Sequence, residues 1–149
     1  MLSKSSEYAI RALVFIQIQN WEKRRPGVIE IAREIEAPAA FSAKILHTLT
    51  THRLLDSMKG RGGGFFFPNG QSDLTLYKVI HIMEGDKLFS SCGIGLKSCS
   101  DTKPCPLHEQ YTPIRNSLIQ LVNSETISSL AQRIRDGKAV LKKDPLKHF

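Results

Sequence analysis

Apolar residues in the first part of the chain recur every three or four positions and predict three consecutive helices. We expect these helices over residues 5–20, 28–36 and 39–52. Ala37 and Pro38 separate the last two, because proline disfavours helical backbone in the residue before it. Two short helices joined by a tight turn form a helix-turn-helix pattern. The three predicted apolar faces consist of Ala9, Ala12, Leu13 and Ile16, then Val28, Ile31, Ala32 and Ile35, then Phe41, Ile45, Leu46 and Leu49.

The side of the 39–52 helix opposite its apolar face carries small and hydrogen-bonding residues. A recognition helix needs such a face, because small residues allow close approach to the groove and polar ones reach bases or phosphates. A solvated helix face with no partner would look the same. The candidate DNA contacts on this face are Ala40, Ala43, Lys44, His47 and Thr51.

Two short segments, at 54–59 (LLDSMK) and 64–67 (GFFF), predict the strands of a β-hairpin after the helix-turn-helix. The intervening Gly60–Gly63 segment (GRGG) supplies the backbone freedom that a tight turn needs. A hairpin in this position is a wing. Lys59 and Arg61 lie at its tip, where basic side chains can enter a minor groove or bind phosphates. A basic turn with no partner is the alternative.

The second half of the chain begins with a helix that Thr75 caps and Gly85 ends. The Gly-, Ser- and Cys-rich stretch 86–105 predicts a loop. A longer helix follows from about 106 to 123, with Pro113 either starting or kinking it. A last short helix begins near Thr126. In the long helix, apolar residues at heptad spacing suit a helix–helix seam: Tyr111, Ile114, Leu118 and Leu121.

These elements predict a mainly α-helical chain with a small β-hairpin wing. The expected organisation is a winged helix-turn-helix DNA-binding domain at 1–85, a cysteine-rich loop at 86–105, dimerisation helices at 106–135 and a flexible basic tail at 136–149. No apolar run approaches the ~20 residues needed to span a bilayer, and the amino-terminal stretch lacks a secretory cleavage site. We therefore expect a cytoplasmic protein that does not enter membranes.

Net charge favours a polyanionic partner. The formal charge is +7 and the isoelectric point about 9.5. Such a balance fits nucleic acid, although many basic proteins bind none. The sequence contains no C-x-x-C pair, phosphate loop or acid–base pair, so we do not expect an enzyme.

All three cysteines lie close together, and the spacing C-x6-C-x5-C-x2-H links Cys92, Cys99, Cys105 and His108. An odd, clustered set in a chain without an export signal argues against structural disulfides. Thiolates bind iron–sulphur clusters, and imidazole can replace one of them. Zinc usually prefers paired C-x2-4-C ligands. A zinc site and free, directly oxidised thiols remain alternatives.

The sequence resembles the Rrf2 family of winged-helix transcription regulators over residues 1–135. The resemblance rests on SSEYAIRAL, IEIAREI, LLDSMKGRGGGFFF, LTLYKVIHIMEG and the three cysteines. It implies a homodimer that binds a pseudo-palindromic operator in double-stranded DNA. It also implies that the state of an iron–sulphur cluster, responding to redox state, oxygen, nitric oxide or cluster supply, controls operator affinity. We expect a repressor.

The resemblance offers two fourth ligands. In IscR-like members a histidine follows the third cysteine, and His108 matches it. In NsrR-like members a carboxylate from the partner's first helix ligates, and Glu7 matches it. The C-x2-H spacing favours His108 and a 2Fe–2S over a 4Fe–4S cluster, which aerobic purification can remove. Ala43 and Lys44 replace the acidic residue and glutamine of IscR-like recognition helices, so we expect a different operator.

Overall fold

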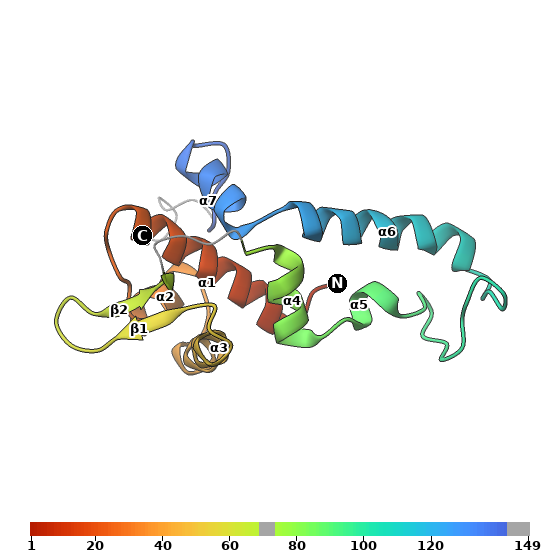
Figure 1. Cartoon of the computed structure of the whole chain (residues 1–149), viewed down its shortest axis with the longest axis horizontal. Coiled ribbons are helices and arrows are strands. Elements are labelled where there is room, and N and C mark those ends of the chain that lie inside the picture. The colour runs from red at the N-terminus through yellow and green to blue at the C-terminus, as the bar shows by residue number, and fades with distance from the viewer. Residues whose placement is uncertain (69–73, 143–149) are drawn as a thin grey trace.

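The computed structural model describes residues 1–68 and 74–142, which form helices and one two-stranded antiparallel sheet (Figure 1). Residues 143–149 of the predicted basic tail lie outside these ranges. The elements in chain order are α1 (Lys4–Trp21), α2 (Val28–Glu34), α3 (Ala39–Thr51), β1 (Asp56–Met58), β2 (Gly64–Phe66), α4 (Leu76–Glu84), α5 (Lys87–Ser90), α6 (His108–Ser124) and α7 (Ile127–Arg135).

Helix α1 is the central element of the fold. The Ser3 hydroxyl caps it by accepting a 3.1 Å hydrogen bond from the Ser6 backbone N–H. Its predicted apolar face is confirmed, because Ala9, Leu13 and Ile16 are all fully buried. Helices α2, α3, α4 and α7 and strand β2 pack against α1. Each fully buried Leu or Ile contributes about 1.5–3 kcal/mol, so these contacts dominate the core.

Helices α2 and α3 pack against each other and form the predicted helix-turn-helix. Pro38 precedes α3 in extended conformation, with φ −60° and ψ 137°. Ile31 and Ile35 are buried beneath the turn. Ile45, Leu46 and Leu49 bury the inner face of α3, as its apolar spacing predicted.

Strands β1 and β2 form the predicted hairpin, with Ser57 opposite Phe65. The first strand is shorter than the predicted 54–59, because Leu54 and Leu55 are buried in the core before pairing begins. Hydrogen bonds to Pro26 and Asn20 fix the hairpin to the rest of the fold. The Phe65 N–H donates to the Pro26 carbonyl at 2.9 Å, and the Phe67 N–H donates to Asn20 Oδ1 at 2.9 Å.

Helices α4 and α7 begin side by side. Thr75 and Thr126 cap them, as predicted, and form a β-bridge with each other. Gly85 ends α4 with a positive φ of 78°, which glycine adopts without steric cost. At this end Glu84 accepts hydrogen bonds from the Ser3 N–H and the Ser6 hydroxyl. The carboxyl end of α4 is therefore tied to the amino end of α1.

The stretch 86–105 is not a continuous loop, which corrects the sequence prediction. Its first residues form α5, because Phe89 is buried in a second apolar cluster with Ile80 and Val122. Helix α6 begins at His108, so Pro113 lies inside it. Figure 1 shows α6 running away from the winged part, with the cysteine loop at the opposite end of the molecule from the hairpin. None of the described helices has the length and hydropathy to cross a membrane.

The glycines at the base of the hairpin give a test of this packing. A Cβ on Gly64 would lie 2.1 Å from the Arg25 carbonyl oxygen, and its φ of 142° disfavours side chains. We expect Gly64→Ala to lower the free energy of unfolding by about 2 kcal/mol or more. Gly27→Ala is the control, because nothing lies within 4 Å of its added Cβ. Equal losses in urea titrations of the two variants would contradict the close approach at Gly64.

Candidate metal centre and DNA-binding surface

All five predicted contact residues of α3 are exposed. Ala40, Ala43, Lys44, His47 and Thr51 lie on the side opposite the buried Ile45, Leu46 and Leu49. The structure therefore brings them together on one accessible helix face. Their contact with DNA remains a prediction.

The wing residues Lys59 and Arg61 are exposed in the turn between β1 and β2. A further cation, which sequence analysis missed, lies at the base of the hairpin. The Arg25 guanidinium stacks 4.3 Å from the centre of the Phe66 ring, and its Nη1 lies 3.2 Å from Met58 Sδ. The charged run WEKRRPG was visible in the sequence, but only the fold places Arg25 against the wing.

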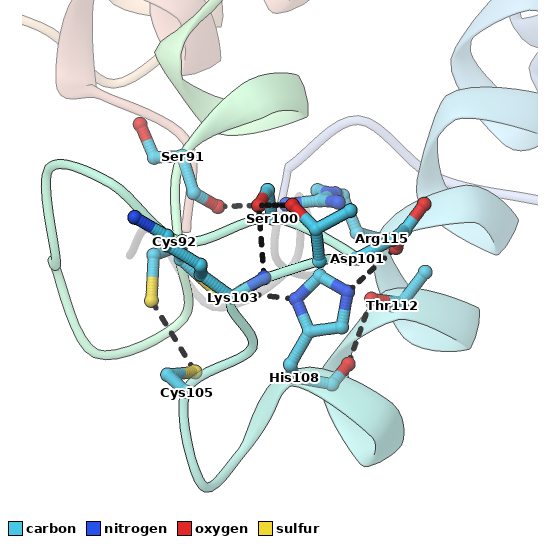
Figure 2. A network of polar contacts seen from close by, with 11 residues as sticks. Ser91, Cys92, Ser100, Asp101, Lys103, Cys105, His108, Thr112 and Arg115 are labelled. Atoms are coloured by element: carbon cyan, nitrogen blue, oxygen red, sulfur yellow. Dashed lines mark hydrogen bonds and ion pairs between the residues drawn. The ribbon is translucent and has the colours of Figure 1, made fainter.

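Cys92, Cys99 and Cys105 converge on one site. Their three Sγ atoms all lie within 4.8 Å of one another. The sulphurs of Cys92 and Cys105 are 3.5 Å apart (Figure 2). Cys105 is buried and the other two are half-buried. Cys92 follows α5 and Cys105 precedes α6, so two helices hold the ends of the loop.

The environment gives these thiols different acidities. A hydrogen bond from the backbone N–H of Ile94, helped by that of Leu96, lowers the pKa of Cys92 to about 7 against the effect of burial. A hydrogen bond from the backbone of Cys105 to the Cys99 thiol acts to lower the pKa of Cys99. Burial and the neighbouring thiols outweigh this bond and raise the pKa of Cys99. Of these two thiols, Cys92 therefore loses its proton more readily. The thiolate is the form that binds metal.

His108, the first residue of α6, lies beside the thiols and is mostly buried, with 16% of its side chain exposed. Its Nδ1 lies 3.2 Å from Cys99 Sγ, and its Nε2 lies 2.8 Å from a carboxylate oxygen of Asp101. The backbone is held too, because the His108 N–H donates to the Cys105 carbonyl and the Thr112 hydroxyl donates to the His108 carbonyl.

Glu7, the alternative fourth ligand, lies in the first turn of α1 and pairs with Lys4 at 3.2 Å. In the described part of the chain, the group of residues close enough to hold a metal ion consists of Cys92, Cys99 and Cys105, and includes neither Glu7 nor His108. Within one chain, His108 lies beside Cys99, while the role of Glu7, which the resemblance assigns to the partner's first helix, stays a prediction.

Helix α6 holds the start of the cysteine loop through two contacts that the sequence did not reveal. Arg115 Nη1 donates a 3.0 Å hydrogen bond to the Ser91 carbonyl (Figure 2). Tyr111 packs against Gly93 so closely that a Cβ there would lie 2.8 Å from the ring. The ring of Tyr111 thus lies against the residue after Cys92. The helix–helix seam to which the heptad pattern assigned Tyr111 stays a prediction.

Three thiols and an imidazole nitrogen form a soft donor set. Such a set fits an iron–sulphur cluster, in which thiolates bind iron and histidine can substitute for one of them. It also fits a zinc ion with Cys3His ligands. The convergence of the donors on one site therefore supports metal binding and leaves the kind of metal open.

Comparison with known proteins gives the family. The model of the Rrf2 family, described as an iron-dependent transcriptional regulator, matches residues 2–133. The chain is 28% identical over 132 residues to protein aau3 of Rhizobium meliloti, covering 88% of this chain and 84% of that one. It is 23% identical over 141 residues to the HTH-type transcriptional regulator NsrR of Oceanobacillus iheyensis, covering 94% and 95%.

Two solved structures share the fold. The cysteine regulator CymR of Bacillus subtilis superposes with a TM-score of 0.71 at 19% identity, covering 89% of this chain and 96% of that one. T. potens IscR superposes with a TM-score of 0.68 at 15% identity, covering 94% and 92%. Because the family model spans almost the whole described chain, the protein belongs to the Rrf2 family of winged-helix transcriptional regulators.

Proposed function

We propose that this chain is a cytoplasmic repressor that binds operator DNA as a homodimer, with its affinity controlled by an iron–sulphur cluster. The observation that carries the proposal is the convergence of three cysteines, with His108 beside Cys99, in a member of this family. Cys92, Cys99, Cys105 and His108 would hold the cluster. When bound, such a group supplies a centre that oxygen or nitric oxide can oxidise or modify.

The exposed face of α3 and the basic wing support the DNA-binding part of the proposal. Lys44 and His47 would face base edges or phosphates in the major groove, and Arg61 would reach the adjacent backbone or minor groove. A net charge of +7 favours association with a polyanion. Arg25 adds a cation at the base of the wing.

An exposed apolar stripe on α6 supports the homodimer. Ile114 is 65% exposed and Leu121 is 51% exposed. Leu107, the residue immediately before α6, lies seven residues before Ile114 and is 39% exposed. A seven-residue spacing keeps these side chains on nearly one face of a helix. Large apolar side chains aligned on a helix that extends from the body favour pairing with a second copy.

A chain of contacts joins the cysteine loop to the DNA-binding helices. Phe89 of α5 packs with Ile80 of α4, and Glu84 at the end of α4 accepts hydrogen bonds from the start of α1. Helix α1 in turn packs against α3. We propose that a change at the cysteines moves α5 and α6, and that α4 and α1 pass this shift to the recognition helix.

Zinc is the second candidate for the bound group. A tetrahedral ion with metal–sulphur bonds of about 2.3 Å separates its sulphurs by about 3.8 Å. The 3.5 Å between Cys92 and Cys105 is close to that value. A zinc-stabilised DNA-binding module would then need no redox signal.

Removing the thiols tests the sensor. We expect a Cys92→Ala, Cys99→Ala, Cys105→Ala variant to keep its circular dichroism but to bind no iron and to show DNA binding unaffected by nitric oxide or oxygen. Ser98→Ala, an exposed change in the same loop, is the control and should respond as the unaltered protein does. A triple variant that still responds would refute the proposed sensing site.

Charged residues in the apolar stripe of α6 test the dimer. Ile114→Glu with Leu121→Glu should give a monomer in sedimentation velocity, because burying unpaired carboxylates in an apolar interface is costly. Gln120→Glu adds a charge to the same helix at an exposed polar position and should leave the dimer intact. A double-Glu variant that sediments as a dimer would place the interface elsewhere.

The wing contact is tested with a duplex selected by the protein from random DNA, at fixed salt. If Arg61 makes a specific base contact, Arg61→Ala should weaken binding by about 1–3 kcal/mol. Lys138→Ala removes the same charge from an exposed position beyond α7 and is the control. Equal affinities of the two variants would remove Arg61 from the specific contacts.

A further inference from the structure

Both ring nitrogens of His108 have a partner, and the two partners differ in chemistry. Nδ1 lies 3.2 Å from the sulphur of Cys99. Nε2 lies 2.8 Å from the carboxylate of Asp101 (Figure 2). A carboxylate can only accept a hydrogen bond, so Nε2 must carry the proton that is shared with Asp101. In the neutral ring the lone pair is then on Nδ1, the nitrogen that faces the thiols.

A short turn fixes Asp101 beside the ring. The backbone groups of Ser100 and Lys103 exchange hydrogen bonds of 3.2 Å in both directions. The Ser100 hydroxyl accepts a further bond from the Lys103 N–H and lies 3.0 Å from the Thr102 hydroxyl. Because Cys99 immediately precedes this turn, one tight segment presents both a thiol and the carboxylate to His108.

We propose that Asp101 is a positioning residue that holds His108 with Nδ1 toward the metal site formed by Cys92, Cys99 and Cys105. The assignment rests on the proposed function for the presence of a metal centre, and on the hydrogen bonds for its geometry. Metal-binding histidines generally donate their second N–H to a carboxylate or carbonyl, which fixes the tautomer and the ring orientation. Asp101 fills that role here.

The exposure of Asp101 decides how it acts. Its side chain is 96% exposed, so water screens its charge, and an exposed ion pair adds little stability. The role left for Asp101 is therefore to orient the imidazole ring of His108. An asparagine, whose amide oxygen also accepts a hydrogen bond, should therefore replace Asp101, while an alanine should not. The same exposure means that neither change threatens folding.

Cobalt(II) alone is the probe, because its visible bands report the ligand set without requiring iron or sulphide. The full-length chain is titrated anaerobically as the unaltered protein and as Asp101→Ala, Asp101→Asn, His108→Ala and Asp136→Ala. We expect Asp101→Ala to bind cobalt about 10- to 100-fold more weakly and to share the ligand-field bands of His108→Ala. Asp101→Asn should keep the original bands and affinity. Asp136→Ala removes an exposed carboxylate elsewhere and should match the unaltered protein.

Two outcomes would overturn the assignment. In one, Asp101→Ala has the affinity and bands of the unaltered protein. In the other, His108→Ala has the affinity and bands of the unaltered protein, which would mean that the histidine is not a ligand. Failure of the proposed sensor function looks different. If protein prepared without oxygen contains neither iron nor sulphide, the proposed cluster is refuted. The expected cobalt pattern would still establish Asp101 as the residue that orients His108.

Discussion

Burial of one helix organises this molecule. Helix α1 is covered by α2, α3, α4, α7 and the second strand of the hairpin, and its side chains from Ala12 to Gln17 are all buried. The recognition helix, the wing and the segment leading to the cysteines thus share one rigid support. Close-packed protein interiors have low compressibility and transmit strain. We therefore expect a shift of α1 to act on α3, which packs against it.

The cysteine loop lies outside this core and depends on weaker contacts. Phe89 attaches it to the second apolar cluster, Arg115 binds the Ser91 carbonyl, and Tyr111 packs on Gly93. These contacts link the thiols to α5 and α6 without burying the loop, much of which remains exposed. Such an arrangement suits a sensor, because a ligand-controlled segment has to rearrange at low cost while its supports keep a defined position.

The sequence predicted elements with strong periodicity or clear caps, and missed those that depend on contacts distant in sequence. Thr75, Gly85 and Thr126 marked helix ends correctly because capping is local chemistry. The short helix α5 was missed because Phe89 is ordered by tertiary burial. The cysteine spacing identified the candidate site, but the roles of Asp101 and Arg115 depend on how the loop folds onto α6.

The metal content of the purified protein decides whether these cysteines hold the proposed iron–sulphur cluster. The chain should be purified without oxygen, and its visible absorption recorded with iron, sulphide and zinc assays on the same sample. We expect a coloured protein containing iron and sulphide. A colourless protein with about one zinc per chain, or with no metal, would refute the cluster and leave a winged-helix regulator that lacks one.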